Sequence, residues 1–170
     1  MDSLDFGTIN IENLQIKRSS NNFIDIVYNG GPLVFWTPKI FIPFGYEEKF
    51  NNYFINFELY DYNNNIELQI FLSVLLKIEE KIIELLGIGN HQLNSQIRHH
   101  DLENPILYTK IIERNKKIIT IVRNDKNEFL NFYKLEKQNF SKNKLVIDKI
   151  WCKNNKYYLK YKVKEMIYYG

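Results

Sequence analysis

The sequence predicts a mainly β protein with one helix, on the basis of three observations. Short runs in which apolar and polar residues alternate recur along the chain, separated by turn-forming residues. One long segment instead carries apolar residues at helical spacing. The 170 residues are 45% hydrophobic and 15% aromatic, which excludes a disordered chain and suffices for one sizeable core. We therefore expect a single domain over residues 1–170.

The first half contains three expected strands and one irregular segment. Residues 23–28 run into the turn-forming sequence Asn29-Gly30-Gly31, which predicts a hairpin with a strand over 33–36. Two prolines flank the segment 39–42, so we expect it to be an edge strand or an irregular crossing. Residues 53–60 alternate clearly and predict a strong strand.

A helix is expected over about residues 66–86. Asparagines precede it as candidate caps, Glu67 lies in its first turn, and Gly87 suits the position after its end. Its apolar stripe is expected to pack on the sheet and comprises Ile70, Phe71, Val74, Leu75, Ile78, Ile82 and Leu85. Its solvated face is expected to comprise Glu79, Glu80, Lys81 and Glu84.

The second half is expected to be β-structure again, after a polar connector over 91–104. The expected strands are 106–112, 117–123, 128–135, 145–151 and 157–169. Many short strands around one helix indicate a sandwich or a barrel. An oligonucleotide-binding (OB-fold) barrel with extra strands and a capping helix has this order of elements.

The net charge of +3 hides an uneven distribution along the chain. Residues 1–104 carry 7 Lys and Arg against 14 Asp and Glu, whereas residues 105–170 carry 16 against 6. Such an asymmetry indicates a half that faces a polyanion. The alternative is codon bias, because the chain has 24 Ile, 22 Asn and 19 Lys but no Ala, as expected of an A/T-rich genome.

The end of the chain combines cations with aromatic rings. Read with period two, Tyr157, Leu159, Tyr161 and Val163 lie on one face of the last expected strand. The opposite face comprises Tyr158, Lys160, Lys162 and Lys164. The preceding hairpin adds Trp151 with Lys149, Lys153 and Lys156. Single-stranded nucleic acid is held by this combination of cations on phosphates and rings under bases. A solvated strand whose rings lie in the core is the alternative, and Trp151 suits either.

A second stacking surface is expected at Trp36. By its phase with Leu33, Phe35 is the expected core residue, which leaves Trp36 on the surface beside Lys39. The remaining cations expected in the groove are Lys110, Lys116, Lys117 and Arg123. The predicted ligand is single-stranded DNA, and RNA stays open because these contacts serve both.

Catalytic signals are weak, and we expect no enzyme and no cofactor. The histidines His91, His99 and His100 lie in one connector without a second ligand set, although Asp101 and Glu103 leave a metal site there as an alternative. Cys152 has no surrounding motif and is expected to be a small buried thiol. The chain has no glycine loop that could cradle a phosphate.

Targeting signals are also missing from the sequence. No apolar run approaches the roughly 18 residues that a membrane span needs, so no transmembrane helix is expected. The opening Met1 to Asp5 has neither a basic nor a long apolar stretch, which predicts no secretory signal. The single cysteine permits no internal disulfide, as is typical of a reducing compartment.

Several motifs together resemble one known family. Thr37-Pro38 is followed by Pro43-Phe44-Gly45, Tyr108-Thr109-Lys110 precedes a hairpin, and Ile147-Asp148-Lys149-Ile150-Trp151 leads into the last strand. Over about residues 4–165 the chain resembles small proteins of nucleo-cytoplasmic large DNA viruses. These proteins are related to the bacteriophage T7 type of single-stranded DNA-binding protein.

This resemblance implies a sequence-nonspecific protein that coats single strands in viral DNA replication and recombination. It implies a location at replication sites in the host cytoplasm or in the virion, replication proteins as partners, and a homodimer or a monomer. Phage proteins of this type usually end in an acidic tail that recruits the polymerase. Residues 164–170 keep aromatic side chains but have no acidic run, so either the tail lies beyond this sequence or recruitment of partners works differently here. The alternative is a virion or host-interaction β-domain whose basic half binds an acidic protein, without preference for single strands.

Overall fold

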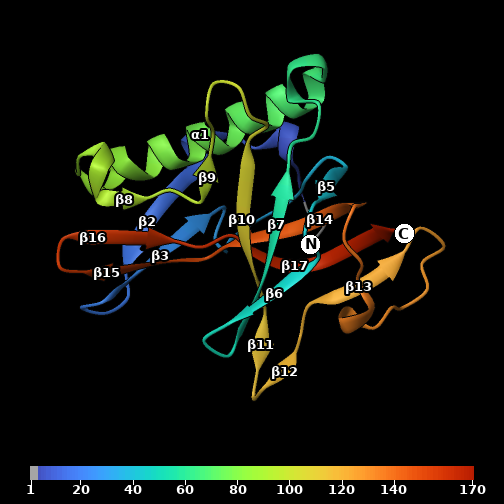
Figure 1. The fold of residues 1–170 in the computed structure, drawn as a ribbon. Coiled ribbons are helices and arrows are strands. Elements are labelled where there is room, and N and C mark those ends of the chain that lie inside the picture. The colour runs from blue at the N-terminus through green and yellow to red at the C-terminus, as the bar shows by residue number, and fades with distance from the viewer. Residues whose placement is uncertain (1–3) are drawn as a thin grey trace.

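Five strands of the computed structural model, which describes residues 4–170, close into a barrel (Figure 1). They are β5 (Ile40–Ile42), β7 (Asn52–Glu58), β10 (Ile106–Ile111), β14 (Asn139–Ile147) and β17 (Lys162–Tyr169). Around the barrel β5 pairs with β7, β7 with β10, β10 with β17, β17 with β14, and β14 with β5. The β10–β17 pair is parallel and the other four are antiparallel. This is the predicted OB-fold barrel.

The first barrel strand is bent at Pro38. Both β4 (Leu33–Trp36) and β5 pair with β14, on either side of the bend. Between them the Thr37 amide donates to the Asn143 carbonyl at 2.8 Å, and the Asn143 amide donates to the Thr37 hydroxyl at 3.0 Å. The prediction of an edge strand or irregular crossing here was wrong. The two prolines flank β5 and do not lie within it, so the backbone N–H groups of β5 can pair with the neighbouring barrel strands.

A second sheet is built from the chain before the barrel, from the connection between the second and third barrel strands, and from the insertion between the fourth and fifth. In spatial order it comprises β2 (Leu14–Arg18), β3 (Phe23–Tyr28), β15 (Lys149–Lys153), β16 (Lys156–Leu159) and β8 (Leu93–Asn94). The hairpin of β15 and β16 projects to the left of the barrel in Figure 1. The predictions of unbroken strands over 145–151 and 157–169 were therefore wrong. The chain passes between the two sheets at Asp148 and again at Lys160 and Tyr161.

Helix α1 (Ile66–Leu86) lies across the end of the barrel and the second sheet (Figure 1), and it has the predicted bounds. The Asn65 side chain accepts a hydrogen bond from the Leu68 amide at 3.2 Å, and Gly87 adopts the left-handed conformation with φ 64°. Its buried residues are Leu68, Phe71, Leu72, Leu75, Ile78, Glu79 and Ile82. Two expectations were wrong, because Ile70 is exposed and Glu79 is buried.

Short elements complete the described part of the chain. They are β1 (Leu4–Asp5), β6 (Tyr46–Lys49), β9 (Ile97–Arg98), β11 (Glu113–Arg114), β12 (Lys117–Ile118) and β13 (Ile121–Asn124). The expected strand over 117–123 is thus split into β12 and β13. The expected strand over 128–135 was wrong: Asn131 caps a 3-10 helix over Phe132–Lys134 by accepting from the Tyr133 amide.

The turn at 29–31 forms, but it does not make a hairpin. Tyr28 and Gly31 bridge each other, while β3 pairs with β2 and β15, and β4 pairs with β1 and β14. The hairpin prediction was wrong because each strand finds its partners in a different sheet. One hydrophobic cluster nevertheless includes side chains from the barrel, the second sheet and α1.

Met1 to Ser3, at the start of the segment that predicts no secretory signal, lie outside the described residues. Among the described residues, no helix is both long and apolar enough to span a bilayer.

Candidate nucleic-acid interface

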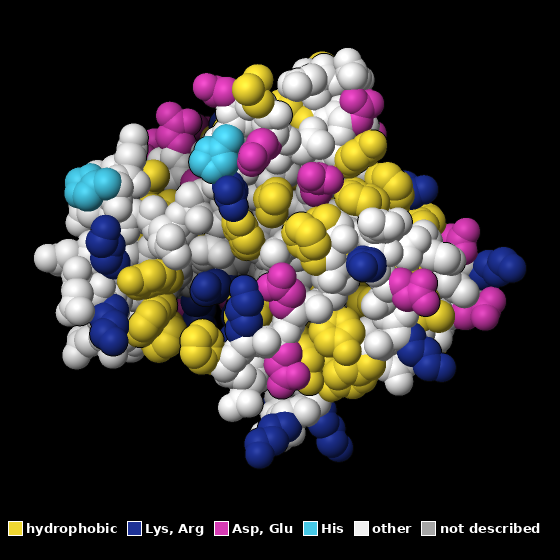
Figure 2. All heavy atoms as spheres, in the orientation of Figure 1, with side chains coloured by type: hydrophobic (Ala, Val, Ile, Leu, Met, Phe, Trp, Pro, Cys, Tyr) yellow, Lys and Arg dark blue, Asp and Glu magenta, His cyan; other side chains and the backbone are white. Residues whose placement is uncertain are grey.

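The ligand surface of an OB-fold barrel is formed by the outer face of its second and third strands together with two of its loops. In this chain those strands are β7 and β10, and the loop between the fourth and fifth strands is the β15–β16 hairpin. Figure 2, in the orientation of Figure 1, shows Lys and Arg side chains and hydrophobic side chains over the hairpin at the left and around the centre, where β7 and β10 lie. We call this surface the front face.

The β7–β10 part of the front face follows from strict alternation. Ile55, Phe57 and Leu107 point into the core, so their neighbours point outward. The register places Phe54 opposite Lys110 and Asn56 opposite Tyr108 on the outside. Each outward pair therefore combines a ring with a cation or an amide.

The hairpin contributes a row of three rings. Phe23, Trp151 and Tyr158 are neighbours across β3, β15 and β16, and the Trp151 and Tyr158 ring centroids are 5.1 Å apart. Trp151 is 40% exposed, while its neighbour Ile150 is fully buried. The open question about Trp151 is thus decided by the second sheet, which buries the opposite face of β15 and leaves the indole on the surface.

Lysines flank these rings closely. The Lys149 ammonium lies 5.8 Å from the Phe23 ring centroid, and that of Lys153 lies 5.7 Å from the Trp151 centroid. Lys156 donates to the His91 carbonyl at 3.4 Å. Phosphates that pass along the ring row would therefore meet cations on either side of it.

Two lysines meet where the hairpin joins the barrel. Lys110 lies on β10, and Lys160 lies in the crossover between β16 and β17. Burial, and secondarily the charge of Lys110, lowers the pKa of Lys160. Within residues 4–170 neither ammonium forms an ion pair with a carboxylate. Two adjacent unneutralised cations favour an anion such as a phosphate.

Lys162, expected to lie free on the outer face of one strand with Lys160, forms an ion pair with Asp148 at 3.0 Å. Lys164 is exposed at the irregularity where the β14–β17 register shifts. The three lysines alternate with buried neighbours, as predicted, but the prediction that one strand carries all three was wrong, because Lys160 lies in the crossover and only Lys162 and Lys164 lie on β17.

Other predicted residues lie away from the front face. Lys116 and Lys117 lie at the exposed tip of the β11–β12 hairpin. Trp36, Lys39 and Arg123 lie around β14 and β17 instead, and Arg123 forms an ion pair with Glu165 at 3.4 Å. The structure thus divides the predicted groove into separate surfaces.

The front face also includes residues that we did not predict, namely Phe23, Phe54, Arg98 and Tyr108. A hydrogen bond with Tyr108 raises the pKa of Arg98, which lies on β9 beside β10. The alternation of Tyr108 and Lys110 with buried neighbours could have identified the β10 part from sequence. The position of Arg98 could not, because it depends on the pairing of β9.

Two observations bear on metal binding and on thiol reactivity. In the part of the chain that is described, no three His, Cys, Asp or Glu side chains come together as a metal site. Cys152 is half-buried, and burial raises the pKa of its thiol, which opposes formation of a reactive thiolate.

The fold and the front face together define an OB-fold barrel whose outer surface brings lysines and aromatic rings together. Among solved structures, the chain is similar to gp2.5, a single-stranded DNA-binding protein encoded by bacteriophage T7, with a TM-score of 0.60 and 11% identity over 81% of this chain and 91% of that one.

It is also similar to the single-stranded DNA-binding protein from bacteriophage Enc34, with a TM-score of 0.57 and 9% identity over 91% and 88% of the two chains. The same phage protein in complex with single-stranded DNA gives a TM-score of 0.55 and 10% identity over 92% and 95%. No family model and no curated protein matches the sequence. At these identities the comparisons establish the fold.

Proposed function

We propose that this protein binds single-stranded DNA on the front face without sequence preference. The observation that carries the proposal is the meeting of Lys110 and Lys160, which form no ion pair within residues 4–170, with the ring row of Trp151 and the half-buried Tyr158. Bases stack on such rings whatever their identity, and lysines neutralise the phosphates between them. The proposed activity is binding alone, with no reaction and no cofactor.

The structural comparisons support this proposal. The similar phage proteins are described as single-stranded DNA-binding proteins, and one of them was solved in complex with single-stranded DNA. The front face lies on the strands and the loop that bind ligands in OB folds generally. Fold and surface chemistry therefore point to the same class of ligand.

We further propose a role in viral DNA replication and recombination, at replication sites in the host cytoplasm. The motif resemblance to proteins of nucleo-cytoplasmic large DNA viruses supports this role, and replication proteins are the expected partners. Sedimentation of the free protein would distinguish a monomer from a homodimer.

The test is fluorescence titration of the Trp36→Phe variant, in which Trp151 is the sole tryptophan. We expect quenching by a dT oligonucleotide of about 6 nucleotides, within the site size of one OB fold. The apparent affinity should fall steeply between two salt concentrations, because phosphate contacts release counterions. A duplex of about 20 base pairs, long enough to stay paired, should bind far more weakly.

The rival function predicts a different pattern. A β-domain whose basic half binds an acidic protein would treat single strand, duplex and heparin alike at matched salt. Equal and weak binding of all three, without quenching of Trp151, would contradict the proposal and favour that rival.

A further inference from the structure

A second surface combines rings and cations on the outer face of β14 and β17. Along β14 the side chains of Phe140, Lys142 and Lys144 point outward, while Ser141 and Asn143 between them are fully buried. We call the outward set the β14–β17 stripe, and it comprises Trp36, Lys39, Phe140, Lys142, Lys144 and Tyr169.

One end of the stripe is an exposed aromatic cluster. The Lys39 ammonium lies 4.2 Å from the Tyr169 ring centroid, and Phe140 lies opposite Tyr169 in the sheet. Phe140 packs on Phe41 at 5.2 Å, and Phe41 packs on Tyr60 at 5.4 Å. Phe140 is 37% exposed and Tyr60 is 55% exposed. These aromatic rings are therefore exposed to solvent instead of being packed in the hydrophobic core.

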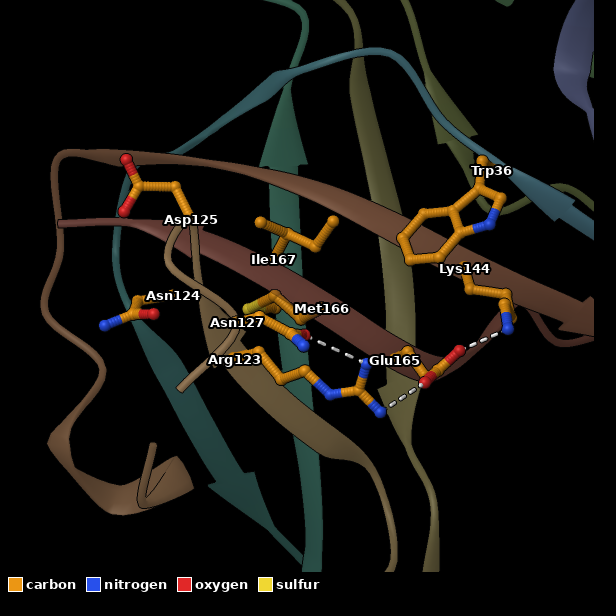
Figure 3. A pocket seen from close by; sticks show the side chains of 9 residues that line it. All are labelled: Trp36, Arg123, Asn124, Asp125, Asn127, Lys144, Glu165, Met166 and Ile167. Carbon is orange, nitrogen blue, oxygen red and sulfur yellow. Dashed lines mark hydrogen bonds and ion pairs between the residues drawn. The ribbon is translucent and has the colours of Figure 1, made fainter. Parts of the chain in front are cut away.

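The other end of the stripe is a pocket of about 400 Å³ (Figure 3). The Lys144 ammonium lies 5.3 Å from the Trp36 ring centroid, and Lys144 and Arg123 both bind the carboxylate of Glu165. The Nε of Arg123 is buried and has no hydrogen-bond partner within residues 4–170. The Glu165 carboxylate thus binds two cations beside a tryptophan. A phosphate group would bind the same two cations in the same way.

The charges on this surface favour a polyanion. Lys144 and Arg123 bind Glu165, which is the one carboxylate on the outer faces of β13, β14 and β17 in the described structure. Lys142 is the next outward residue along β14, and Lys39 lies at the other end of the stripe, with Asp125 and Glu67 at the margins. Within residues 4–170 neither Lys39 nor Lys142 forms an ion pair. Flat rings between free cations suit stacked bases and phosphates.

The stripe also adjoins the front face. Lys110 on β10 lies beside Lys162 on β17, and Lys162 lies opposite Val146 on β14, one outward position from Lys144. Neighbouring strands are about 4.8 Å apart, so cations follow one another across the wall of the barrel. A strand that leaves the front face at Lys110 therefore has only Lys162, whose ammonium is paired with Asp148, and the buried Val146 to pass before it reaches Lys144.

We infer that the β14–β17 stripe binds a second segment of the same single-stranded DNA, so that a long strand wraps around the barrel. This inference rests on the proposed function. It predicts that the stripe engages only oligonucleotides longer than the front face can hold.

The test compares dT oligonucleotides of about 6 and about 30 nucleotides, below and above the range of site sizes for one OB fold. In the Trp151→Phe variant, Trp36 is the sole tryptophan, and we expect its fluorescence to respond to the long oligonucleotide only. In the otherwise natural chain, Phe140→Ala with Lys142→Glu should weaken binding of the long oligonucleotide roughly tenfold and leave the short one unchanged.

Lys77→Glu is the control for the charge reversal, because its side chain is exposed on α1, outside the strands of both surfaces. It should change neither affinity. Glu165→Gln guards against loss by misfolding, since it frees Arg123 and Lys144 and should tighten binding of the long oligonucleotide several-fold.

The outcomes separate the two proposals. Failure of the unmodified protein to bind either oligonucleotide overturns the proposed function itself. Binding of both with no effect of the stripe variants overturns only the second surface. If sedimentation shows an unmodified dimer that Phe140→Ala with Lys142→Glu converts to a monomer, the stripe is an interface between copies, and the inference is wrong.

Discussion

The carboxylate of Glu79 on α1 accepts a hydrogen bond from the Ser95 hydroxyl at 3.0 Å. Ser95 lies between β8, which pairs with Tyr157 and Tyr158 of the hairpin, and Gln96, whose carbonyl accepts from the Tyr108 amide. Glu79 thereby anchors the segment that joins both parts of the front face, although no ligand would touch it.

This anchor should make stability depend on pH. Glu79 is only 5% exposed, and burial raises its pKa from 4.5 to about 7. Between these values the folded state binds more protons than the unfolded state, so the free energy of unfolding should fall as pH rises from about 4.5 to about 7. The contribution is about 3 kcal/mol at most. Urea unfolding at several pH values should show a flatter profile for Glu79→Gln. An unchanged profile would contradict the role given to burial.

Lys160 should report on phosphate contact. Lys160→Gln should weaken binding of the short oligonucleotide and reduce the magnitude of the log affinity against log salt slope by about 0.7, the value for one single-strand contact. Salt titration against Lys77→Gln, an exposed control on α1, measures the difference. A slope identical to that of the unmodified protein would remove Lys160 from the interface.

Trp151 and Tyr158 should report on stacking. Replacing either by Ala should cost about 1–3 kcal/mol of binding free energy for the short oligonucleotide, with little change of the salt slope. Phe129→Ala is the control, since that ring is 75% exposed and lies outside the front face. Equal losses from Phe129→Ala and Trp151→Ala would show that stacking on the hairpin is not specific.

Asn65 should contribute to stability as the cap of α1. Its side chain satisfies the Leu68 amide, so Asn65→Ala should lower the free energy of unfolding by about 1 kcal/mol. Asn63→Ala, at an exposed position that caps no helix, should have little effect in the same urea titration. Similar losses for both variants would contradict the capping argument.

Local patterns predicted much of this structure. Alternation correctly assigned Phe35 to the core and Trp36 to the periphery, and the apolar run with its caps gave the bounds of α1. The burial of Glu79 was not predicted, because a charged side chain on a helix is expected to face solvent. Its burial depends on a connector 16 residues away in sequence.

The sequence by itself determined the alternation of side chains, the position of the helix and the concentration of cations in the second half. Only the tertiary structure decided which of those cations act together. Leu159, Tyr161 and Val163 are buried without a break in period two, although the chain changes sheets at Lys160 and Tyr161. Both sheets bury the odd-numbered side chains there. The alternation of apolar and polar residues therefore does not reveal where the chain crosses from one sheet to the other. Pairing partners divided the basic half between the front face and the β14–β17 stripe, because strand pairing is set by contacts far apart in the chain.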